Sequence, residues 1–144
     1  SQIPKAKIIY CYRNPKDHII ELYKYNLKDY LTLKTSIVEL AKTIVIIDNI
    51  MEEYKTRFHS KIYFLNFDQL ILAPKREIES LLNWLNWTYD KKYLTPKLLP
   101  KGVIESINDF NSFNTSYINK SKNYIEILKP VEKILSKMIR NRND

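Results

Sequence analysis

An arginine followed by a helix-starting turn is the feature of this sequence best suited to chemistry. Arg13 ends an apolar run over residues 7–12, and Asn14, Pro15 and Asp17 follow it. An arginine at the carboxyl end of a strand, beside a helix N-terminus, can bind an anion, because the guanidinium supplies charge and the helix supplies unpaired N–H groups. The sequence therefore predicts an anion-binding site at this turn.

A structural role for Arg13 is the alternative. The guanidinium can pair with Asp17, four residues further on, or with Asp68, which follows a second apolar run. Asp68 in turn is either an active-site carboxylate or a residue that orders its loop by hydrogen bonds. The sequence leaves these alternatives open.

Two apolar runs predict the strands that position Arg13 and Asp68. Residues 7–13 and 61–67 are almost continuously apolar, as in parallel strands buried on both faces. Helices are expected at about 17–26, 36–58, 74–85 and 122–140. This order predicts an α/β fold, rich in helices, with a small parallel sheet and helical crossovers.

The longest predicted helix begins at Ser36, a residue that caps helices, with Glu39 placed as in a capping box. Its apolar residues recur every three or four positions and predict the inner face, which comprises Ile37, Leu40, Ala41, Ile44, Ile47, Met51, Tyr54 and Phe58. Because other apolar residues widen this stripe, the helix is expected to be a core crossover rather than part of a coiled coil.

The second half of the chain contains several helix-ending signals. Pro74 suits a first helical turn, and Asn86 suits a left-handed helix end. Residues 88–119 predict a loop with one helical turn at 103–110. Pro130 conflicts with the last helix, and predicts either a kink or the start of a second helix.

Composition limits the classes of function. The 144 residues fit one domain, and Gly102 is the only glycine, which argues against a glycine-dependent phosphate loop in this chain. Cys11 is the only cysteine, and no apolar run is long enough to span a membrane, so a reducing, cytoplasmic setting is expected. His18 and His59 are expected at the surface, and no metal site is predicted.

The formal charge of +8 has two interpretations. It can reflect a lysine-rich solvated surface, or a basic face that attracts an anionic partner. Because the basic residues are spread along the chain, a nucleic-acid groove is not indicated, although the basic surface keeps nucleic-acid binding as a third functional alternative.

The sequence resembles the C-terminal half of a sulfotransferase domain, in particular domains joined to tetratricopeptide repeats in bacterial proteins. The segment that binds the donor's 3′-phosphate in that family is matched by Pro4, Ala6, Lys7, Ile8, Ile9, Arg13, Asn14, Pro15 and Asp17. A second family segment is matched by Phe67-Asp68-Gln69-Leu70, Pro74 and Trp84-Leu85-Asn86-Trp87. The resemblance covers about residues 3–128 and implies the later part of a P-loop-like fold.

The resemblance also implies a donor and its ligands. The donor is 3′-phosphoadenosine 5′-phosphosulfate, which Arg13 and Asn14 would help to bind. The family serine that contacts the same phosphate is Glu21 here, and a carboxylate repels a phosphate. Lys120 or Lys122 could supply a replacement positive charge. The family arginine, tyrosine and tryptophan near the C-terminus align with Phe110, Asn114 and Ser121.

The implied function is transfer of a sulfuryl group to a hydroxyl acceptor. The family's glycine-containing loop and catalytic base lie upstream of the arginine strand, and this chain contains no such loop. Residues 1–144 are therefore expected to form one partial domain that is inactive alone and that works with an upstream segment of the parent protein. The alternative is a degenerate, non-catalytic module that binds an anion or a partner.

Overall fold

The computed structural model of the chain describes residues 6–25, 36–94 and 114–139. In chain order its elements are β1 (Ile8–Tyr12), α1 (Pro15–Tyr25), α2 (Ile37–Arg57), β2 (Ile62–Asn66), α3 (Phe67–Leu72), α4 (Pro74–Leu85), three short 3₁₀ helices η1 (Lys91–Leu94), η2 (Thr115–Tyr117) and η3 (Lys120–Tyr124), and α5 (Ile125–Leu135). The predicted α/β fold is confirmed, since the described residues are mostly helical around a parallel pair of strands.

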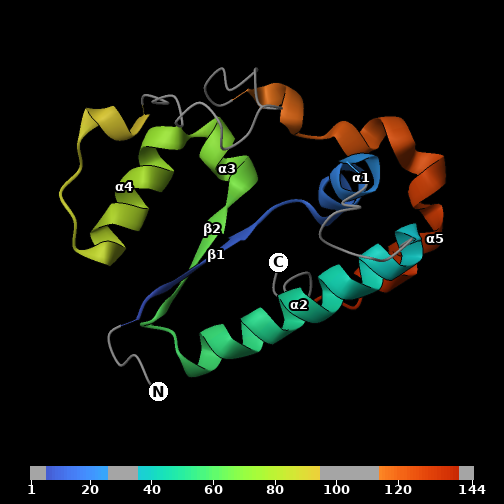
Figure 1. The fold of residues 1–144 in the computed structure, drawn as a ribbon, viewed down its shortest axis with the longest axis horizontal. Coiled ribbons are helices and arrows are strands. Elements are labelled where there is room, and N and C mark those ends of the chain that lie inside the picture. The colour runs from blue at the N-terminus through green and yellow to red at the C-terminus, as the bar shows by residue number, and fades with distance from the viewer. Residues whose placement is uncertain (1–5, 26–35, 95–113, 140–144) are drawn as a thin grey trace.

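The two strands are parallel and pair in a register that runs from Ile8 opposite Ile62 to Tyr12 opposite Asn66. Figure 1 shows the pair crossing the middle of the molecule. Because both strands end at the same edge of the sheet, the residues that follow them, Arg13 and Phe67, are brought together.

Helices cover opposite faces of this strand pair. Tyr63 packs against Trp84 of α4, with 5.4 Å between ring centroids. The next residue, Phe64, lies under the ammonium of Lys55 of α2, 4.2 Å from the ring centroid. Since successive strand residues point to opposite faces, α4 and α2 lie on opposite sides of the sheet (Figure 1).

The prediction that both strands are buried on both faces is wrong for β1. Ile62 and Leu65 of β2 are buried, but Ile8 and Ile9 of β1 are 50% and 41% exposed, and Cys11 is exposed. Within the described residues β1 pairs only with β2. A continuous apolar run indicates that a strand can be buried on both faces, but it does not show which residues would pack against those faces.

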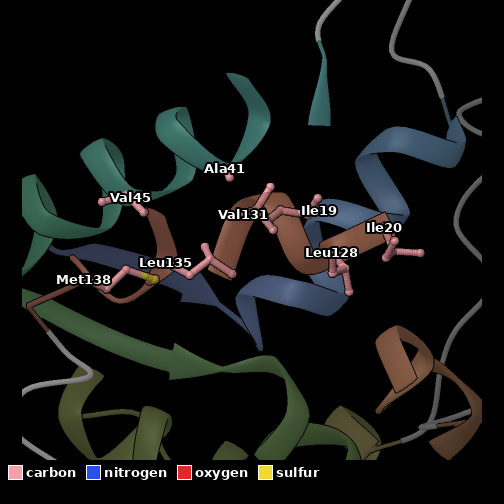
Figure 2. Close-up of a cluster of buried hydrophobic side chains, with 8 residues drawn as sticks. All are labelled: Ile19, Ile20, Ala41, Val45, Leu128, Val131, Leu135 and Met138. Atoms are coloured by element: carbon pink, nitrogen blue, oxygen red, sulfur yellow. The ribbon is translucent and has the colours of Figure 1, made fainter. Parts of the chain in front are cut away.

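The main hydrophobic core lies among helices rather than on the sheet. Figure 2 shows side chains of α1, α2 and α5, and of the residues just after α5, converging on one another. The cluster consists of Ile19, Ile20, Ala41, Val45, Leu128, Val131, Leu135 and Met138. Each is less than 9% exposed, so this cluster holds α1, and with it the turn at Arg13, in place.

Helix α2 has the predicted extent, and its predicted inner face is confirmed at Leu40 and Ala41 but is wrong in the second half of the helix. Ser36 caps it, its Oγ accepting a hydrogen bond from the Glu39 N–H at 3.2 Å. The predicted inward residues Ile47, Tyr54 and Phe58 are about half exposed. The residues of α2 that are buried are Leu40, Ala41, Val45 and Asp48.

Local signals correctly predicted several ends in the second half of the chain. Pro74 begins α4, and Asn86 ends it in the left-handed region, with φ of 61°. Pro130 lies inside α5 and does not end the helix, while the predicted turn at 103–110 lies outside the described residues. The short helix α3 was not predicted. No helix among the described residues has the length and apolarity needed to cross a membrane.

Candidate functional site

The site begins where both strands end. Asn14 caps α1, its Oδ1 accepting hydrogen bonds from the N–H groups of Lys16 and Asp17 at 2.9 and 3.3 Å. Asn66 caps α3 in the same way. The Asn14 N–H in turn donates to Oδ2 of Asp68 at 2.7 Å. Asp68 therefore binds the turn after β1 through its backbone, and the structure supports a loop-ordering role for this carboxylate.

Arg13 lies on the ring of Phe67, with 5.0 Å from the guanidinium carbon to the ring centroid. Its Nη2 donates to the carbonyl of Tyr117 at 2.6 Å and lies 3.8 Å from Oδ2 of Asp17. The side chain is 14% exposed. Of the two ion-pair partners that the sequence suggested, the structure gives Arg13 the contact with Asp17, while Asp68 binds Asn14 instead.

One donor of this guanidinium has no acceptor among the described residues. The Nε–H of Arg13 is buried and, in the part of the chain that the structure describes, makes no hydrogen bond. A buried N–H without an acceptor costs free energy, so this position favours a ligand or water that carries an acceptor oxygen. Oδ1 of Asp68 is likewise buried without a hydrogen bond among the described residues.

Glu21 and Lys120 form an ion pair. The Lys120 ammonium lies 3.0 Å from Oε1 of Glu21 and 4.5 Å from the ring centroid of Tyr117. Both side chains are largely buried, at 13% and 27% exposed. The Glu21 carboxylate is therefore neutralised by Lys120, and the structure brings together these two residues of the predicted donor site.

The other predicted residues are placed differently. Lys122 is exposed in the middle of η3, and Asn114 is exposed and caps η2. Ser121 is buried, and its N–H donates to Asp17 at 2.7 Å. Phe110 lies outside the described residues. No group of three or more potential metal ligands occurs among the described residues.

A small pocket of about 50 Å³ lies between β1, α1 and α2 and was not predicted. It is lined by Tyr10, Cys11, Tyr12, Arg13, His18, Ile44, Ile47 and Asp48. Asp48 is 2% exposed, and the Tyr10 hydroxyl donates to its Oδ1 at 3.4 Å. The sequence carried a signal for Asp48, since it lies seven residues after Ala41 on the buried side of α2.

His18 is half-buried, so its predicted surface position is wrong, whereas His59 is exposed as predicted. Burial lowers the pKa of His18 below 6.5, and the positive charge of Arg13 lowers it further. Both causes disfavour the protonated imidazole. At neutral pH the pocket therefore contains a neutral imidazole next to the guanidinium.

Comparisons with known proteins address the identity of this arrangement. A scan against family models matches the model described as "Sulfotransferase domain" over residues 2–142. A search of curated proteins found no match, and a search of solved structures found none either. The family match extends over nearly the whole chain and includes the Arg13 turn and the segment at 117–121. The chain therefore belongs to the sulfotransferase domain family.

Proposed function

We propose that this chain supplies the 3′-phosphate side of a donor site in a sulfotransferase. Family membership implies 3′-phosphoadenosine 5′-phosphosulfate as the general donor. The reaction transfers its sulfuryl group to a hydroxyl acceptor in the complete, cytoplasmic protein. The resemblance to domains joined to tetratricopeptide repeats in bacteria supports a parent protein of that kind.

The observation that carries the proposal is the state of Arg13. Its guanidinium is fixed by Phe67 and the Tyr117 carbonyl, so little side-chain entropy remains to be lost on binding. Within the described ranges, its buried Nε–H lacks an acceptor. A held guanidinium with an unused donor fits a phosphate oxygen, because charge-assisted hydrogen bonds to phosphate are among the strongest that proteins form.

The remaining catalytic parts are assigned elsewhere. Because Gly102 is its only glycine, we do not assign to this chain the glycine-containing loop that holds the 5′-phosphosulfate. The base that removes the acceptor proton lies upstream of the arginine strand in the family, so we do not assign it to this chain either. We propose that residues 1–144 form one partial domain, and that the parent protein supplies both parts. Lys122 and Asn14 remain candidate donor ligands, Lys122 through its exposed position after Lys120 and Asn14 through its place beside Arg13.

A non-catalytic, anion- or partner-binding module is the second candidate. It is favoured by the pairing of Arg13 with Asp17 and of Lys120 with Glu21, because each cation then has a carboxylate beside it. Such a site has less positive charge to offer a phosphate than two isolated cations would. Affinity for the nucleotide distinguishes the two candidates.

Calorimetry with adenosine 3′,5′-bisphosphate tests the proposal on the 144-residue chain. We expect weak binding that Arg13→Ala reduces at least about tenfold, since a charge-assisted hydrogen bond is lost. Glu21→Ser should tighten binding, because it removes the carboxylate and frees Lys120. Arg76→Ala is the matched control, since Arg76 is exposed on α4 and pairs with Glu77.

Three outcomes separate the alternatives. Equal affinity in the Arg13→Ala chain would refute the assignment of Arg13. Binding seen only after Glu21→Ser would favour the degenerate module. No nucleotide binding in any variant, together with strongly salt-dependent binding to mixed DNA, would favour nucleic-acid binding by the basic surface instead.

A further inference from the structure

Asp17 is a fully buried carboxylate in the first turn of α1. Both of its oxygens bind a distant segment of the chain: Oδ1 accepts from the Ser121 N–H and Oδ2 from the Asn119 N–H, each at 2.7 Å. These short bonds are of the strong, charge-assisted kind. An acidic residue in the first turn of a helix usually interacts with the N–H groups of its own helix. Asp17 instead accepts hydrogen bonds from backbone N–H groups more than 100 residues away in the sequence.

The distant segment is shaped to meet this carboxylate. Asn119 is in the left-handed region, with φ of 59°, where the chain turns into η3. The turn directs the N–H groups of Asn119 and Ser121 to the two oxygens of Asp17. A left-handed backbone is costly for most residues, and asparagine tolerates it best after glycine.

Asp17 lies midway between two other contacts with the same segment. Arg13 binds the Tyr117 carbonyl, and Glu21 binds the Lys120 ammonium. Arg13, Asp17 and Glu21 follow one another at intervals of four residues, which places the last two on one face of α1. The side chain of the middle residue, Asp17, is fully buried, and it contacts this segment through backbone N–H groups.

We propose that Asp17 is a positioning residue that holds residues 117–121 on α1 and thereby fixes the guanidinium of Arg13. It acts through the backbone of Asn119 and Ser121, which sets the place of the Tyr117 carbonyl, and through its own contact with Arg13 at 3.8 Å. The inference rests on the proposed function for its meaning to donor binding. The structural part of it can be tested without a nucleotide.

Asp17→Asn is the test variant, because it keeps the size of the side chain and one acceptor oxygen but puts an NH₂ against the second N–H. We expect the amides of Asn119 and Ser121 to exchange with solvent at least about tenfold faster, the change that loss of one charge-assisted hydrogen bond produces. The Nε–H of Arg13 should exchange faster as well. Hydrogen exchange followed by NMR measures all three groups.

A merely structural role predicts a different pattern. A general loss of stability would accelerate the amides of α1, α2 and α5 in step with those of residues 119 and 121. That result, or unchanged exchange at 119 and 121, would overturn the proposal. Asp90→Asn is the matched control, since Asp90 is exposed and accepts from the Lys92 N–H at 2.9 Å.

The unmodified chain provides an independent measurement if Asp17→Asn does not fold. Its amides at 119 and 121 should be as protected as those of α1, and exchange at the rates of an unstructured peptide would overturn the proposal.

Affinity for adenosine 3′,5′-bisphosphate completes the experiment. Asp17→Asn should weaken binding about tenfold, with no effect from Asp90→Asn. If the unmodified chain binds no nucleotide, the proposed function fails, while the exchange data still decide the role of Asp17. If Asp17→Asn frees the two amides but binds the nucleotide as tightly as the unmodified chain, Asp17 does not position Arg13 for the donor.

Discussion

The helical part of the molecule and the strand pair differ in how completely they are covered. Side chains of α1, α2 and α5 form the dense cluster of Figure 2, in which Ile19, Val131 and Met138 are fully buried. The strand pair is covered by α2 and α4, but Ile8 and Ile9 of β1 remain about half exposed. The two parts are joined at the Arg13 turn, where β1 ends and α1 begins.

This difference shows where the candidate site obtains its rigidity. Arg13 follows the more exposed strand, yet its contacts are to Phe67, Tyr117 and Asp17. Asp17 begins the helix that carries Ile19 and Ile20 into the core. The order of the site therefore depends on the helical core and on the segment at 117–121 more than on the packing of β1.

The same substitution in the two parts should give the largest difference. Ile19→Ala should lower the free energy of unfolding by about 2–5 kcal/mol, because it removes buried methyl groups and leaves a cavity. Ile8→Ala should cost about 1 kcal/mol, because half of that side chain already faces solvent. Denaturant unfolding of the two variants measures both effects. Equal losses would show that β1 is as tightly packed as the helical core.

Local chemistry in the sequence predicted the ends of several elements. Ser36 caps α2, Pro74 begins α4 and Asn86 ends it, and each of these depends on the residue itself and its immediate neighbours. The turn after β1 was also predicted, and there Asn14 provides the cap of α1.

Features that depend on distant partners were not predicted. The apolar stripe of α2 did not show which side faces the core, since Ile47 and Ile50 are as apolar as the buried Val45. The bonds from Asn119 and Ser121 to Asp17 join residues more than 100 positions apart, and no local pattern encodes them. The Glu21–Lys120 ion pair was partly anticipated, because the resemblance placed both residues at the donor site although it did not predict that they pair.

The two left-handed asparagines provide a comparison of intermediate size. Asn86 ends α4 beside the strand pair, and Asn119 leads into η3 at the candidate site. Changing either to alanine should lower the free energy of unfolding by about 1 kcal/mol, because alanine has a Cβ but lacks the short polar side chain that lets asparagine tolerate this region, whereas glycine should be tolerated at both. Thermal or denaturant unfolding measures the effect.

Asn83→Ala is the control for these two variants, because Asn83 is exposed within the regular part of α4 and alanine favours a helix. This change should leave stability unchanged or slightly higher. If Asn119→Ala were as harmless as Asn83→Ala, the backbone of Asn119 would not be held in the left-handed region, and its bond to Asp17 would be in doubt.

The smallest expected effect is a pH dependence at the junction of the two parts, where His18 lines the pocket between β1, α1 and α2. Burial, and then Arg13, lower the pKa of His18 below 6.5. The unfolded chain therefore binds a proton more readily than the folded chain does. Stability should be constant above pH 6.5 and fall as pH decreases from there toward the lowered pKa.

His18→Gln should remove this part of the pH dependence, because glutamine keeps a polar side chain that does not titrate. His59→Gln is the matched control, since His59 is exposed. Unfolding curves collected across this pH range for the three chains measure the difference. If the unmodified chain and the His18→Gln chain lost stability in parallel on acidification, the titration of His18 would not be the cause of the pH dependence.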